Sequence, residues 1–126
     1  MACFTVPLAE AIIVSAVKAV ALRRHAADTL SEAKKAKIEN IKEKIGWLQN
    51  MLYGGSFLLA IEHLYHGEIS FVPPFLTAMK TPEEIPLMLH EMATVGVGMA
   101  LLTTAVWGVI VGINHALKKR RGLLLA

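Results

Sequence analysis

The sequence predicts an all-α fold: an integral membrane bundle of three helices, the second of which extends into the cytoplasm. Hydrophobic residues make up 55% of the 126-residue chain and charged residues only 18%, which leaves too little polar surface for a small soluble domain. The apolar residues fall into three long runs, and the basic residues are concentrated in two of the segments outside them. Length and composition therefore predict one membrane domain.

The first apolar run covers residues 4–22 and ends at two arginines. A helix of this length just crosses a hydrocarbon core of roughly 30 Å. Lys18 lies close enough to the basic end for its ammonium to reach the interface, whereas Glu10 lies inside the opposite end. A helix lying on the membrane surface is the alternative, but the polar residues form no continuous face. We expect residues 4–22 to cross the membrane.

The segment at 23–44 is polar and basic. Thr29 and Glu32 match a capping box, in which an N-cap threonine is followed three residues later by glutamate. Only Gly46 disfavours a helix in the residues that follow, so we expect one helix to continue from the cytoplasm into the membrane. Aromatic residues are absent among these charges, which is unlike single-stranded nucleic-acid binding surfaces. We expect no nucleic-acid partner.

The second apolar run covers residues 45–66, with Trp47 and Tyr65 near its ends, as is typical of interfacial aromatic residues. The linker that follows, at 67–85, contains Pro73-Pro74, which rules out a continuous helix there. Because this linker is apolar for a loop, we expect it to lie in the membrane interface.

The third apolar run is the strongest, since no charge occurs between Met92 and Ile113, and we expect a span at about 86–116. Small residues recur along it at every fourth position, a spacing that lets another helix approach closely. These residues are Gly96, Ala100, Thr104, Gly108 and Gly112. The partner is either another helix of this chain or a second copy, and we expect a homo-oligomer or a larger membrane complex.

The charge distribution predicts the topology. Nearly all lysines and arginines lie in the 23–44 linker or after residue 117, whereas the 67–85 linker has only Lys80. Cytoplasmic segments carry an excess of lysine and arginine. The sequence therefore predicts an inner (plasma) membrane location with the N-terminus outside and the C-terminus in the cytoplasm.

This topology places ionisable residues of all three helices at one depth, near the outer face. Imidazole and carboxylate groups are the usual ligands of zinc, iron and manganese. We therefore predict a transition-metal site near the outer face, and its candidate ligands are Glu10, Glu62, His63, His66, His90 and Glu91.

The predicted ligands match a metal site by residue type and not by motif. Glu62 is followed three residues later by Tyr65, so the Glu-x-x-His pair of di-iron bundles is absent. His90-Glu91 lacks the second histidine of the zinc-protease pattern, because Thr94 stands there. The metal's identity and any enzymatic activity stay open at this point.

Three alternatives to a metal site remain. In the first alternative, the cluster only fastens helices together in a structural or accessory membrane subunit. In the second, it forms part of a proton or cation pathway. Polar residues largely stop below the cluster, which disfavours the pathway. Histidines on two helices, such as His63 and His90, are also a ligand pair for haem, which would make the chain a membrane oxidoreductase. The single cysteine, Cys3, allows no intrachain disulfide.

Overall fold

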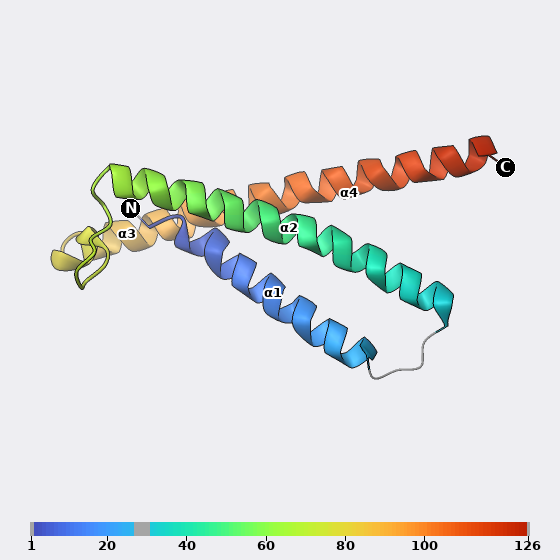
Figure 1. Ribbon diagram of the computed structural model, residues 1–126. Coiled ribbons are helices and arrows are strands. Elements are labelled where there is room, and N and C mark those ends of the chain that lie inside the picture. The colour runs from blue at the N-terminus through green and yellow to red at the C-terminus, as the bar shows by residue number, and fades with distance from the viewer. Residues whose placement is uncertain (1, 27–30, 126) are drawn as a thin grey trace.

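The computed structural model describes residues 2–26 and 31–125, without the side chains of His25 and Ala26. Its main elements are α1 (Thr5–Ala26), α2 (Glu32–Tyr65), the short 3₁₀ helix η1 (Thr77–Lys80), α3 (Ile85–Glu91), the π-helical turn η2 (Met92–Gly96) and α4 (Val97–Leu125) (Figure 1). Across the described ranges the only β pairing is an isolated bridge between Ile69 and Leu76. The predicted all-α class is confirmed.

The helices meet at one end of the molecule and diverge toward the other. The start of α1, the end of α2 and the α3–η2 segment come together, and α4 then crosses the α1–α2 pair and extends beyond it (Figure 1). The helices α3, η2 and α4 follow one another without a break from residue 85 to 125. The start of α1 and the end of α2 therefore lie at the same end of the molecule.

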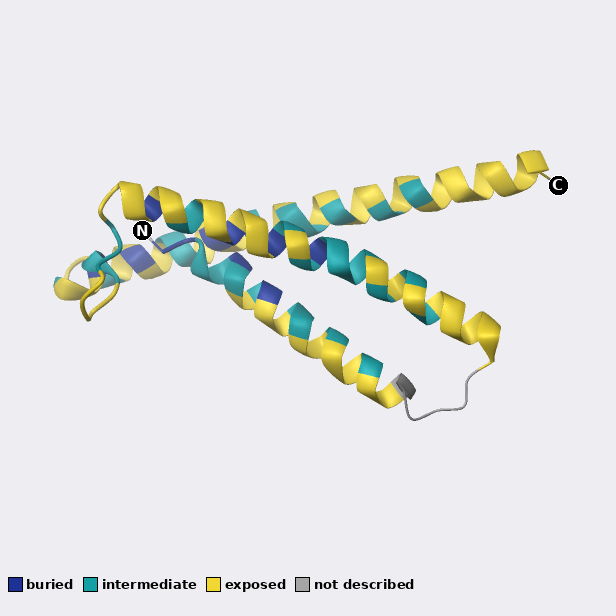
Figure 2. Cartoon of the chain, in the orientation of Figure 1, coloured by how far each residue is buried: buried dark blue, intermediate teal, exposed yellow. Residues whose placement is uncertain are grey.

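Two small apolar cores hold this arrangement. Ala11, Leu48 and Leu52 form the first, between α1 and α2, with Val14 and Trp107 packed against them. Ala2, Ala78 and Met88 form the second, at the end where the helices meet. Most other apolar side chains of the described residues are exposed, along the whole outer part of α4 above all (Figure 2).

Two helical segments, Thr5–Arg24 and Ile85–Leu125, are long and apolar enough to cross a membrane, by length and composition alone. They contain the predicted spans 4–22 and 86–116 almost entirely. The predicted span 45–66 lies in α2, apart from its last residue. α2 does not reach the same hydropathy, because Gln49, Asn50 and Glu62 interrupt its apolar part. That span stays a prediction.

The start of α2 differs from the prediction. The helix begins at Glu32, which makes Ser31 the N-cap residue, with an extended backbone at φ −61° and ψ 151°. The Ser31 carbonyl accepts the backbone N–H groups of Lys34 and Lys35 at 2.9 and 3.1 Å, and its hydroxyl makes no capping bond. Glu32 is thus the first helical residue and not the third, and the predicted cap Thr29 lies outside the described residues.

The stripe of small residues is divided between two environments. A Cβ atom added to Gly96 would lie 2.8 Å from Val6 Cγ2 and 2.9 Å from the Cys3 carbonyl oxygen, so this glycine permits close contact with the start of α1. Ala100 is buried as well. Gly108 and Gly112 have open space around them. The first part of the stripe packs within the chain, and the predicted self-association concerns only the second part.

The 67–85 linker folds back on itself. Ser70 N–H donates to the Phe75 carbonyl at 2.7 Å, and Thr77 N–H donates to the Glu68 carbonyl at 3.0 Å. Phe71, Val72 and Phe75 project outward, between 62% and 85% exposed. The predicted interfacial position of this loop stays a prediction.

Candidate functional site

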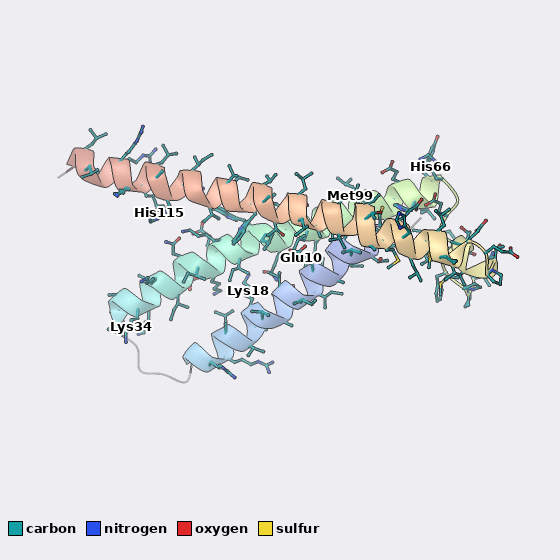
Figure 3. All side chains as sticks on the ribbon, turned by 180° about the vertical axis from the view of Figure 1, so that it is seen from behind. Glu10, Lys18, Lys34, His66, Met99 and His115 are labelled. Carbon is teal, nitrogen blue, oxygen red and sulfur yellow. The ribbon has the colours of Figure 1, made fainter. Side chains whose placement is uncertain are left out.

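A pocket of about 220 Å³ lies at the end where the helices meet. Figure 3 shows His66 and Met99, from α2 and α4, at this end of the molecule. Most of the side chains that line the pocket carry atoms able to bind a metal. The lining residues are Cys3, Leu59, Glu62, His63, His66, Glu68 and Met99.

His63 is the buried centre of the pocket, with only 7% of its surface exposed. Its Nδ1 lies 2.6 Å from the Leu59 carbonyl oxygen, one helical turn earlier. A carbonyl only accepts hydrogen bonds, so Nδ1 carries the proton and Nε2 of the neutral ring presents a lone pair. The Phe4 ring meets the imidazole edge-on at 5.3 Å between centroids. The ring's tautomer and orientation are therefore both held.

Cys3 supplies the second buried polar group. Its Sγ lies 3.3 Å from His63 Nε2, so the thiol donates a hydrogen bond to the ring's lone pair. The residue stands just before α1, where the Thr5 N–H and hydroxyl both bind the Ala2 carbonyl and fix the turn. Burial raises the pKa of the Cys3 thiol above its ordinary value of 9.0, and the negative charges of Glu91 and Glu68 add to this.

Glu68 reaches the pocket because of the way α2 ends. Gly67 has φ +73°, the left-handed conformation that glycine adopts without strain. Gly67 N–H donates to the Leu64 carbonyl and Glu68 N–H donates to the His63 carbonyl, at 3.1 and 2.9 Å, which is the Schellman pattern. The chain therefore reverses over the helix end, and Glu68 Oε2 lies 3.6 Å from His63 Nε2.

The six predicted ligands do not form one cluster. Glu62 and His66 line the pocket with exposed side chains. His90 is exposed and does not line the pocket. Glu91 does not line it either, although its negative charge acts on Cys3. The sequence could not show this separation, because side chains at the same depth in a bundle can project in different directions around their helix axes.

Glu10 lies outside the pocket and bonds to another helix. Its Oε1 accepts a hydrogen bond of 2.6 Å from the Thr104 hydroxyl, so it joins α1 to α4. Similar bonds join the other helices. Lys18 and Ser15 of α1 both bond to Gln49 of α2, and Trp107 Nε1 of α4 donates to the Lys44 carbonyl at 2.7 Å.

Cys3, Glu68 and Met99 are the pocket residues that the sequence reasoning left out. The sequence marks Cys3 only as a cysteine without a disulfide partner in the chain, and it gives no signal for Met99. The glycine just beyond the end of α2 could have predicted the position of Glu68. A glycine there lets the chain reverse, which brings the next residue back toward the last helical turn.

The pocket brings together thiol, imidazole, carboxylate and thioether groups. Over the described part of the chain, no group of three or more His, Cys, Asp or Glu side chains could hold a metal ion in the positions that they take. Cys3 and His63 are buried, whereas the side chains of Glu62 and His66 are exposed. The arrangement is a fixed pair of donors with adaptable donors around it.

The raised pKa of Cys3 predicts slow alkylation. The thiolate is the nucleophile, and burial disfavours it, so iodoacetamide should label Cys3 far more slowly in the folded protein than in SDS at pH 7.5. The folded rate should keep rising as the pH passes 9, because the thiol then ionises. Mass spectrometry of timed samples measures the labelling. Equal labelling rates at pH 7.5 in SDS and in a mild detergent that keeps the protein folded would contradict the prediction.

Comparisons with protein-family models, with curated proteins and with solved structures found no match.

Proposed function

We propose that this chain is a small integral membrane protein that binds a transition-metal ion, zinc above all, in the pocket around Cys3 and His63. It crosses the bilayer three times, with this pocket near the outer face and the C-terminus in the cytoplasm. The two long apolar helices and the excess of basic residues at 23–44 and after residue 117 support this topology.

The crossing by α2 is supported by the hydrogen bonds of Gln49, which lies near the cytoplasmic end of the predicted span 45–66. Gln49 Oε1 accepts from Lys18 Nζ at 2.6 Å, and Gln49 Nε2 donates to Ser15 Oγ at 2.7 Å. Polar groups in hydrocarbon are costly unless they find such partners. Because α1 satisfies the amide on both sides, α2 can carry it through the membrane beside α1.

One observation carries the metal proposal: the Cys3 thiol and the fixed Nε2 of His63 face each other in a pocket rich in further donors. With metal–ligand bonds of about 2.3 Å to sulfur and about 2.0–2.1 Å to nitrogen, two tetrahedral ligand atoms lie about 3.5 Å apart. The observed separations are 3.3 Å from Sγ to Nε2 and 3.6 Å from Nε2 to Glu68 Oε2. These donors need little movement to bind one ion.

The environment of His63 adds to this argument. Histidines that bind metals usually donate their other ring N–H to a carbonyl or carboxylate, which orients the ring and raises its basicity. The bond from His63 Nδ1 to the Leu59 carbonyl is of this kind. On binding, the Cys3 thiol loses its proton to solvent and its thiolate coordinates the ion. A third ligand comes from a side-chain rotation of His66, Glu62 or Glu68.

The donor set selects among metals. Thiolate and imidazole favour zinc, whereas magnesium and manganese prefer oxygen ligands. Manganese was one of the ions expected from the histidines and glutamates alone, and the inclusion of Cys3 argues against it. The haem site predicted from the sequence needs two histidines in one site as axial ligands, and His63 and His90 do not share the pocket.

A zinc titration of the detergent-purified protein tests the proposal. The chelator-stripped protein should bind about one zinc ion per chain when titrated against a chromophoric competitor. His63→Ala should lower the affinity by more than about 100-fold, because loss of even a second-shell partner costs 10–100-fold.

The matched control is His90→Ala, which removes a histidine at the same end of the molecule but outside the pocket. It should bind zinc as the unmodified chain does. An equal loss in both variants would favour the ligand cluster predicted from the sequence over the pocket. Absence of zinc binding in the unmodified chain, with its helical content intact, would refute the metal proposal.

A second function has its own support, namely that of a structural or accessory membrane subunit. The bonds from Thr104 to Glu10, from Lys18 to Gln49, and from Trp107 to the Lys44 carbonyl each join two helices. The polar side chains within the bundle are thus used for packing. On this proposal the exposed outer part of α4, with Gly108 and Gly112, would face another subunit or a second copy.

A further inference from the structure

The helices α1 and α2 diverge toward the linker that joins them (Figure 1). A groove lies between them there. Its volume is about 90 Å³ and its lining is almost entirely apolar. The residues that line it are Lys18, Ala21, Leu22, Ile38, Ile41, Lys42 and Ile45. Because α1 and α2 diverge beyond the core formed by Ala11, Leu48 and Leu52, their separation leaves this groove open.

The groove is bordered by positive charge. Lys18 and Lys42 belong to its lining, and the exposed side chains of Arg23 and Arg24 lie one to two residues beyond it on α1. Lys42 contacts Glu39 at 3.4 Å, but both side chains of that pair are largely exposed, and such pairs are weak. An anionic group at the rim would therefore find several cations within reach.

Lys18 is the cation whose position calls for a partner. It lies inside the apolar helix Thr5–Arg24, where an ammonium is costly. Its Nζ donates to the neutral amide of Gln49. Within the described ranges, no carboxylate forms an ion pair with it. A negative charge arriving from the interface would lower this cost.

We propose that the groove binds one phospholipid with an anionic headgroup, its phosphate near Lys18, Lys42 and Arg23 and its acyl chain lying against Ala21 and Ile45, two groove residues that belong to the predicted spans 4–22 and 45–66. Basic sites between transmembrane helices on the cytoplasmic side take such lipids. The proposal rests on the membrane topology given above and is independent of the metal pocket.

Native mass spectrometry of the detergent-purified full chain tests the site. After incubation with equal amounts of dioleoylphosphatidylglycerol and dioleoylphosphatidylcholine, the spectrum should show one retained molecule of the former per chain. Ala21→Phe fills the groove from an exposed position and should abolish retention. Lys42→Gln should weaken it about fivefold, the effect of roughly one cationic contact.

The matched control is Lys118→Gln, which removes the same charge from the C-terminal basic segment, away from the groove. It should retain the lipid as the unmodified chain does. An equal loss in Lys118→Gln and Lys42→Gln would show that net charge and not the groove governs binding, and would overturn the proposal. Equal retention of the two lipids, or retention by Ala21→Phe, would overturn it as well, whereas failure to insert into bilayers would refute the topology itself.

Discussion

Gly96→Val is expected to destabilise the protein by about 3 kcal/mol or more. The new side chain would begin 2.8 Å from Val6 Cγ2 and 2.9 Å from the carbonyl oxygen of Cys3. Overpacking costs about 1–3 kcal/mol even where flexible side chains can yield, and here one of the obstacles is backbone. The long helix must therefore move away from the start of α1. Thermal melting in mild detergent, followed by circular dichroism, measures the loss.

The same substitution should weaken zinc binding, because moving the start of α1 draws the Cys3 thiol away from His63. Gly98→Val is the matched control, since a Cβ at Gly98 meets nothing within 4 Å. That variant should melt within a few degrees of the unmodified chain and keep its zinc affinity. Equal destabilisation by both substitutions would mean that Gly96 is not a packing contact with α1.

The helices were predictable from the sequence because the pattern that defines them is local. An uncharged run such as Met92 to Ile113 has few alternatives to a helix, and the structure contains it within one unbroken helical segment. The π-helical turn Met92–Gly96 was not predictable in the same way. It inserts an extra residue into the helical repeat, at a place where Gly96 lies close to Val6 and Cys3.

The candidate site was predictable only in part. The sequence pointed to His63 through its place at the end of an apolar run, and the structure makes it the buried centre of the pocket. It could not show that Cys3, sixty positions away, would bond to it, since that contact depends on how α1 packs against α2. Depth along a helix follows from sequence position, but direction around the axis is decided by packing. Glu10 and His90 were grouped with His63 for this reason.

Leu52→Ala is expected to destabilise the protein by about 2–5 kcal/mol, the usual cost of removing most of a buried leucine side chain. Leu52 is 1% exposed and packs with Ala11 and Leu48 in the core that joins α1 to α2. Ala11 is too small to fill the space that the truncation leaves, so the cavity should persist. Chemical or thermal unfolding in mild detergent measures the change.

Leu58→Ala provides the comparison, because Leu58 lies on the same helix and is 67% exposed. It should change the stability by less than about 1 kcal/mol, since surface substitutions are usually within 0.5 kcal/mol. In addition, Leu52→Ala should leave the Cys3–His63 pair largely in place, because α2 also contacts α1 at its far end through that bond. A large loss from Leu58→Ala would instead reveal that the face of α2 exposed in the single chain is buried against a second copy or another subunit.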